Sequence, residues 1–493
     1  MRLLIGVLFC IVSIYSASAQ IFRMNFSAKY VKDAYRTNHI LTDNEQYTWF
    51  VRVDKKFIGT DYFIEQYNTN SLELVQEDKI NLPEIQNRTT ELNDLLLIHK
   101  KPYLTVSNRY KNQTLLYGYP ADNTSNLQFI DTLSSTNFAW IPSVFHTNHE
   151  LAQIVRNKKD NTLQLNITKV DSLFRINKPS SFFTKLPYQS TILEKGCILN
   201  DKEYVFIFSH EIITNTVHTS KNYYLVYIKK DSITTSQLKL EHREINQLVI
   251  QPYQNSILVA GTYEKKTETN QHGVFYLQWD KNKNSILESQ FKDLNTNFFQ
   301  TNIDAMGTEK IQTNYTIKGL FPKKDASIAF VLEEYKYQKI CFSDSRTNIV
   351  TCNDHYYHND IIVVNFNPTS PKDWITRIPK IQHAYNASPT YHNTAVTTDG
   401  ENIYLFYNDH IKNLNATTTD SKIRELSNLR KAVATAVTVD KDGVFQKKML
   451  TDENEKGIRF QQHILRPDGN LIWLLNTNPS AFKWGMRIST MKF

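Results

Sequence analysis

Glycine and cysteine are scarce in this sequence, and the motifs of several common enzyme classes are missing. The 493 residues include 13 glycines and 4 cysteines. No two cysteines have the CxxC spacing of a zinc ribbon or a thioredoxin-like redox site, so neither is expected. GxSxG nucleophile elbows, GxxxxGKS/T phosphate loops and HExxH zinc motifs are also absent. We therefore assign no catalytic residue, no metal ligand and no cofactor from motifs.

Long apolar runs and blocks of like charge are missing as well. After the N-terminal segment, no stretch approaches the ~20 apolar residues that a membrane-spanning helix requires. The formal net charge is +8, but Lys, Arg, Asp and Glu are interspersed along the chain. Without a basic stripe, this excess is typical of a solvated surface, and nucleic-acid binding is not expected.

The N-terminal segment has the features of a secretory signal peptide. One positive charge, Arg2, precedes an apolar core over residues 3–15, and the small residues Ala17, Ser18 and Ala19 follow. We expect cleavage after Ala19, which would leave Gln20 as the new N-terminus. The prediction is a secreted or periplasmic protein, with residues 1–19 as signal peptide and residues 20–493 as a single domain.

Three cysteines remain after this cleavage: Cys197, Cys341 and Cys352. The last two flank the ten residues FSDSRTNIVT. This spacing suits a disulfide that pins an exposed loop in an oxidising compartment. The alternative is three reduced, buried thiols.

Short apolar segments bounded by polar turns recur along the whole chain, and sustained helical periodicity is nearly absent. The most hydrophobic segments form a ladder, spaced by roughly 50 residues in the first half and roughly 70 in the second, as expected for a repeated sheet of about four strands. Its rungs are residues 47–53, 95–98, 151–155, 204–208, 256–260, 327–332, 402–407 and 471–475.

The ladder predicts an all-β fold, a β-propeller. Inner strands of a propeller are buried on both faces, which explains continuous apolar runs in place of strict alternation. If the first and last rungs share a blade, pairing of the N- and C-terminal strands closes the ring and removes an exposed edge. We therefore favour seven blades, with six or eight also allowed.

Local signals agree with this interpretation. Asp399-Gly400, Asp440 to Gly443 and Asp468-Gly469 predict tight turns, because glycine adopts positive φ without steric cost. The segment SKIRELSNLRK, residues 421–431, departs from the β pattern and predicts a short helix or ordered loop between strands.

Four segments carry a resemblance to a known group of proteins: FVLEEYKYQ (330–338), YYHNDIIVVNFNPTSPKDWITRIPKIQ (356–382), LFYNDHIKNL (405–414) and TVDKDGVFQKKML (438–450). They are similar to secreted, propeller-like, functionally uncharacterised proteins of Bacteroidetes-type bacteria. In such relatives the return strand commonly has Trp, basic residues and Ile-Pro-Lys, which Trp374, Arg377 and residues 378–380 match. The resemblance covers residues 320–450 and implies compartment and fold, with no catalytic motif to transfer.

Aromatic residues are the main hint of a binding surface, at 12% of the chain with 27 Tyr and 27 Phe. Tyr335 and Tyr337, and the pair Tyr356 and Tyr357, are predicted to lie in loops and are candidates for stacking on a sugar or contacting a protein. The alternative is that these rings pack between blades. His355 and His358 are three residues apart, as are His146 and His149, so in a strand each pair faces opposite sides and a metal site is not expected.

Two functions follow from these observations. The first is a non-enzymatic secreted or periplasmic scaffold that binds a protein or glycan through loops at one end of the propeller channel. The alternative is a polysaccharide hydrolase or lyase, with carboxylates and histidines from several blades meeting at the channel mouth. An open site where such side chains converge would favour the enzyme. A third possibility is a structural, self-assembling surface protein.

Overall fold

The computed structural model consists almost entirely of β-strands. It describes residues 23–26, 31–32, 36–41, 46–55, 60–82, 90–108, 113–119, 127–134, 138–142, 148–170, 175–200, 202–213, 219–240, 243–265, 271–294, 314–343, 350–367, 373–386, 392, 394–416, 423–450, 459–465, 471–480 and 483–492.

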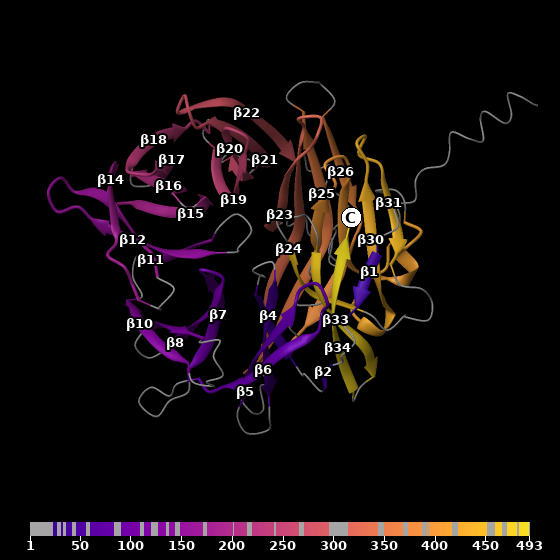
Figure 1. The fold of residues 1–493 in the computed structure, drawn as a ribbon. Coiled ribbons are helices and arrows are strands. Elements are labelled where there is room, and N and C mark those ends of the chain that lie inside the picture. The colour runs from indigo at the N-terminus through magenta and orange to yellow at the C-terminus, as the bar shows by residue number, and fades with distance from the viewer. Residues whose placement is uncertain are drawn as a thin grey trace, which may run out of the picture.

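The described strands form eight antiparallel sheets that follow one another around a ring (Figure 1). Sheet 1 contains β3 (Arg36–Leu41), β4 (Tyr47–Lys55), β5 (Thr60–Asn68) and β6 (Leu74–Ile80). Sheet 2 contains β7 (Glu91–Ile98), β8 (Lys101–Asn108), β9 (Gln113–Gly118) and β10 (Gln128–Ser134). Sheet 3 contains β11 (Phe138–Pro142), β12 (His149–Arg156), β13 (Thr162–Thr168) and β14 (Ser180–Pro187). Sheet 4 contains β15 (Thr191–Asn200), β16 (Glu203–Ile213), β17 (Thr219–Lys229) and β18 (Ser232–Leu238).

The second half of the ring repeats the pattern. Sheet 5 contains β19 (Arg243–Tyr253), β20 (Ser256–Lys265), β21 (Gln271–Asp280) and β22 (Ser285–Leu294). Sheet 6 contains β23 (Asn314–Pro322), β24 (Ile328–Ser343), β25 (Val350–Phe366), β26 (Trp374–Ile378) and β27 (Gln382–Tyr385). Sheet 7 contains β28 (Ala395–Thr398), β29 (Ile403–His410), β30 (Ala432–Val439) and β31 (Phe445–Met449). Sheet 8 contains β32 (Arg459–Leu465), β33 (Leu471–Ser480) and β34 (Lys483–Lys492), with the N-terminal β1 (Arg23–Phe26) and β2 (Val31–Lys32) both paired to β34.

These sheets confirm the all-β propeller and its closure by N- and C-terminal strands. Strand β1 pairs with β34 over four residues, and at the junction of the two ends β3 contacts β32. Each rung of the sequence ladder lies in a different sheet. Counted along the chain from β3 onward, seven of the eight rungs lie in the second strand of their sheet, and the rung in β7 lies in the first strand. Seven blades were favoured because the first and last rungs were expected to share one, but these rungs lie in neighbouring sheets. The described strands therefore form eight sheets, a number that the prediction also allowed.

The core lies between neighbouring sheets. Strand β29 is buried at every position, and its apolar side chains pack with those of β24, β25 and β30. A Leu, Ile or Phe side chain that is fully buried stabilises the fold by about 1.5–3 kcal/mol. Burial on both faces is the physical reason for the continuous apolar runs.

The predicted Asp-Gly turns are present where the structure describes them. Gly400 and Gly443 have φ of 89° and 83°, a region that L-residues with side chains rarely adopt. A Cβ atom on Gly443 would lie 2.8 Å from the ring of Trp374, so the turn also needs glycine for space. Asp468-Gly469 lies outside the described residues.

The segment predicted as a short helix or ordered loop is an ordered loop in its described part, residues 423–431. It makes a parallel bridge from Leu426 to Gln382 and ends in a 3₁₀ turn, η4 (Leu429–Lys431). A second such turn is η3 (Ile411–Asn413). No helix among the residues that the structure describes has the length and apolar character needed to cross a membrane.

Candidate functional site

The most distinctive feature of the ring is the long hairpin formed by β24 and β25. These strands have 16 and 17 residues, whereas their neighbours β23 and β26 have 9 and 5. Cys341 pairs directly with Cys352 near the far end, and the predicted disulfide between them is present. Both cysteines are exposed, while Cys197 is free and buried. The disulfide therefore staples a regular hairpin in which the ladder continues to Ser343 and Val350, where a loop was expected.

Replacing Cys341 and Cys352 with serine is expected to leave the ring folded and to loosen the hairpin tip. The disulfide joins cysteines that are 11 positions apart in the sequence, and for a loop of about 15 residues such closure contributes about 3 kcal/mol. That contribution acts on the tip, because the apolar core lies elsewhere. Hydrogen exchange of residues 336–343 and 350–357 should become faster while the thermal midpoint of the ring changes little. Global unfolding of the double variant would contradict this assignment.

The four candidate tyrosines lie in the strands of this hairpin, on two different faces. Directly paired residues share a face and neighbours along a strand alternate. The tyrosine face carries Tyr335, Tyr337 and Tyr356, together with His358. The rings of Tyr337 and Tyr356 lie 5.2 Å apart, and Tyr335 packs on His358 at 5.0 Å. Whether these tyrosines bind a ligand stays a prediction.

The histidine face carries Tyr357, His355 and, from β27, His383. Tyr357 and His383 stand parallel, with ring centroids 4.5 Å apart and planes 3° apart. His355 Nδ1 lies 3.0 Å from His383 Nε2, and the two imidazoles are nearly coplanar at a centroid distance of 5.2 Å. This edge-to-edge geometry is that of an N–H···N hydrogen bond. Glu425 lies 3.5 Å from the other ring nitrogen of His383.

The hairpin also exposes large apolar side chains. Among the described residues, Phe342 is 59% and Val350 is 61% exposed, one on each face of the tip. Tyr337 is 48% exposed on the tyrosine face, and Tyr385, at the end of β27, is 53% exposed. Several large apolar side chains are therefore exposed on one hairpin, which is a feature of interaction surfaces.

At its base the hairpin enters a buried charged cluster around Glu333, which we call the Glu333 centre. The Glu333 side chain is 0% exposed, and both of its oxygens are occupied. Oε1 accepts hydrogen bonds from Lys380 Nζ and Thr394 Oγ1. Oε2 lies 2.6 Å from Lys318 Nζ and 3.2 Å from His358 Nδ1. The centre thus joins β23, β24, β25, the segment after β26 and the segment before β28.

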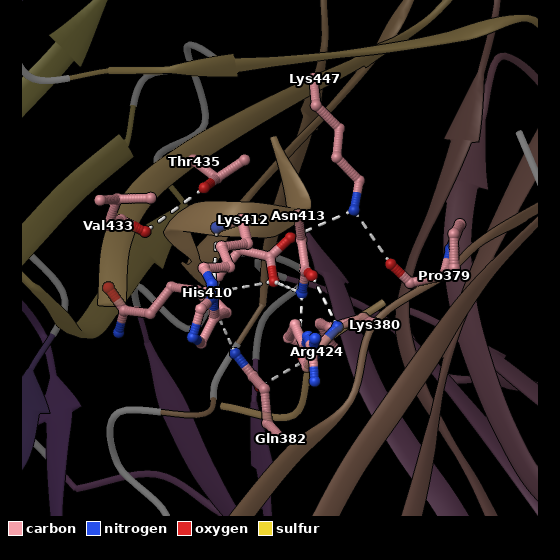
Figure 2. Close-up of polar contacts among 12 residues, drawn as sticks. Pro379, Lys380, Gln382, His410, Lys412, Asn413, Arg424, Val433, Thr435 and Lys447 are labelled. Carbon is pink, nitrogen blue, oxygen red and sulfur yellow. Dashed lines mark hydrogen bonds and ion pairs between the residues drawn. The ribbon is translucent and has the colours of Figure 1, made fainter. Parts of the chain in front are cut away.

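A second buried cluster, the Asp409 centre, lies in sheet 7 (Figure 2). Asp409 Oδ2 is 3.1 Å from Lys447 Nζ, and both side chains are 0% exposed. Asp409 Oδ1 accepts from Asn413 Nδ2 at 2.7 Å. Figure 2 shows Lys447 extending toward the Pro379 carbonyl, to which it donates at 3.0 Å.

Tyr407 and Gln382 connect the two centres. The Tyr407 ring has Lys380 Nζ at 5.3 Å and Lys447 Nζ at 5.9 Å from its centroid. Gln382 accepts from Lys380 Nζ at 3.1 Å and donates to the backbone carbonyl of Asn408. The two clusters therefore form one polar seam between sheets 6 and 7.

The return-strand motif of Trp374, Arg377 and residues 378–380 lies in this seam. Trp374 Nε1 donates to the carbonyl of Lys441 in the next sheet, and Arg377 pairs with Asp360. Pro379 accepts from Lys447, and Lys380 binds Glu333. In this chain the motif holds two sheets together.

Burial and the neighbouring charges shift the pKa values of the groups in the Glu333 centre. Burial alone would raise the pKa of Glu333, but Lys318 and Lys380 hold that pKa well below its usual range. Burial lowers the pKa of His358, which the Glu333 carboxylate opposes only partly. Burial lowers the pKa of His392 to about 3, aided by His358 and Lys380. The stable state is an ionised carboxylate with two ammonium groups and neutral imidazoles.

This centre brings an acidic group and histidines together, as the enzyme alternative requires, but in a closed form. Glu333 and Asp409 are both 0% exposed and each is bound by a lysine, so neither can contact a substrate.

Within the described residues no group of three or more His, Cys, Asp or Glu side chains could hold a metal ion. His355 and His358 do face opposite sides, toward His383 and Glu333. His146 lies outside the described residues. The enzyme alternative stays a prediction.

No protein-family model and no curated protein matches this chain, so the resemblance to a Bacteroidetes-type family stays a prediction. Solved structures do match at low similarity. The β-propeller domain of the Trilobed protease from Pyrococcus furiosus is 10% identical, with 87% of this chain and 98% of that chain covered and a TM-score of 0.36. The polysaccharide lyase Uly1 is 10% identical, with 95% and 92% covered and a TM-score of 0.38. The α-L-arabinofuranosidase Arb93A from Fusarium graminearum is 8% identical, with 60% and 94% covered and a TM-score of 0.27. We draw no function from them.

Proposed function

We propose that this protein is a secreted or periplasmic propeller scaffold that binds a partner protein through the β24–β25 hairpin. Residues 20–493 form the propeller domain after removal of the signal peptide at Ala19. The disulfide between Cys341 and Cys352 is compatible with an oxidising compartment.

One observation carries this proposal: a disulfide-stapled hairpin exposes apolar side chains on both of its faces. Phe342 and Val350 at the tip carry no polar group that could orient a sugar hydroxyl. A partner protein with a groove can bury both faces of such a hairpin, and the tyrosines behind the tip are residues that often dominate binding energy. The disulfide lowers the entropy cost of ordering the hairpin on binding. These features favour a protein over a glycan.

The test compares two matched double variants in affinity capture from the envelope of the producing cell. Phe342→Ser with Val350→Ser removes the tip side chains. Phe183→Ser with Val444→Ser is the control, because these residues are 55% and 60% exposed but lie in β14 and in the turn before β31. We expect the captured protein, once purified, to bind the hairpin variant at least about tenfold more weakly than the wild type, a loss of about 1.4 kcal/mol.

The control should bind like the wild type. Equal binding by both double variants would exclude the hairpin as the binding element. A glycan-binding screen runs in parallel. If the wild type binds a glycan saturably and the hairpin variant does not, the ligand of the hairpin is a glycan and the proposed protein partner is wrong.

A further inference from the structure

The base of the hairpin contains two buried histidines that the proposed binding surface does not use. His358 lies in β25, whereas His392 lies in the connection between β27 and β28. Their rings are 5.9 Å apart with planes at 18°. The residues are 9% and 5% exposed. Among the described residues, His358 Nε2 and His392 Nδ1 have no hydrogen-bond partner.

The surroundings of this pair have no place for an added positive charge. Both oxygens of Glu333 already accept from lysine, threonine and His358. The next carboxylates, Asp360 and Asp409, are paired with Arg377 and Lys447. Among the described residues, five charged or titratable groups act on the pair: Lys318 of β23, Glu333 and Tyr335 of β24, Lys380 after β26, and His383 of β27.

We propose that this junction is an acid-sensitive latch, in which protonation of His358 and His392 opens the contact of the hairpin base with His392 and Thr394. A proton on either ring adds a third cation beside Lys318 and Lys380, with one carboxylate between them. Opening exposes the two imidazole rings to water. The apolar cores between the other sheets are not expected to open, because protonation of these two histidines adds no charge to them. The proposal does not depend on which partner the hairpin binds.

The direction of the pH dependence follows from linkage. The pKa of His392 is about 3 in the closed state and about 6.5 for a histidine in water, so the open state binds more protons between these values. The free energy that favours the closed latch therefore has its full value above about pH 6.5 and decreases as the pH falls from about 6.5 toward about 3. For one histidine with this difference, the opening constant rises about 30-fold between pH 7.5 and pH 5.

Hydrogen exchange of the full chain at these two pH values, corrected for intrinsic exchange, tests the latch. Peptides covering residues 333–343 and 350–360 should open at least about tenfold more often at the lower pH, while sheets 1 to 5 do not change. His392→Phe and His358→Phe should each reduce this pH ratio, even where they also lower stability at both pH values. His272→Phe, in β21, is the control and should keep the wild-type ratio. A wild-type ratio near one, or an unchanged ratio in both hairpin-base variants, would overturn the latch.

Discussion

Replacing Glu333 with alanine is expected to lower the free energy of unfolding by about 3–5 kcal/mol, among the largest effects of any single change in this chain. The substitution leaves Lys318 and Lys380 close together, with Lys380 fully buried and without its carboxylate. Breaking a buried ion pair by removing one partner is strongly destabilising, because the remaining charge is uncompensated in a poorly polarisable interior. The measurement is the free energy of unfolding in urea, monitored by the fluorescence of the aromatic core.

Lys380→Met is the comparison for this prediction. It removes one cation but leaves Glu333 with Lys318, His358 and Thr394, so the carboxylate keeps three of its four partners. The expected loss is about 1–3 kcal/mol, the range for a buried group that loses one partner. A loss for Lys380→Met equal to that for Glu333→Ala would show that the carboxylate is not the centre of this cluster.

The fold was predictable because its signal is local. Strands that are buried on both faces, such as β29 and most of β20, leave a continuous apolar run in the sequence. The disulfide was predictable for the same reason, since Cys341 and Cys352 are close in the chain. The number of sheets was harder to predict, because it depends on which distant strands share a sheet.

The hairpin and the two charged centres were less predictable, for different reasons. The alternation in YKYQK, residues 335–339, is a strand signal that was interpreted as loop aromatics. The sequence shows that Glu333 directly follows the apolar run 328–332. Its partners Lys380 and Thr394 are 47 and 61 residues away in the sequence. Sequence spacing does not pair these residues, because the pairing of β24, β25 and β26 brings Lys380 to Glu333, and Thr394 arrives from the connection to the next sheet. The return-strand motif at Trp374 and Lys380 pointed to this region without revealing that its role is to hold the sheets together.

Asp409→Ala is expected to lower the free energy of unfolding by about 3–5 kcal/mol, because it leaves Lys447 buried with only the Pro379 carbonyl and the Tyr407 ring. Here the charges form a single pair, which allows a sharper test than at Glu333. The double variant Asp409→Ala with Lys447→Met removes both charges and keeps the apolar stem of the lysine.

The double variant should recover at least about 2 kcal/mol of the loss, because replacing a whole buried pair by apolar groups is often neutral. A residual loss of about 1–3 kcal/mol is expected, since Asn413 Nδ2 and the backbone N–H of His410 lose their carboxylate acceptor. Urea unfolding of the two variants measures the difference. A double variant no more stable than Asp409→Ala would mean that the uncompensated charge of Lys447 is not the cause, and that the Asn413 and His410 hydrogen bonds carry the stability of this centre.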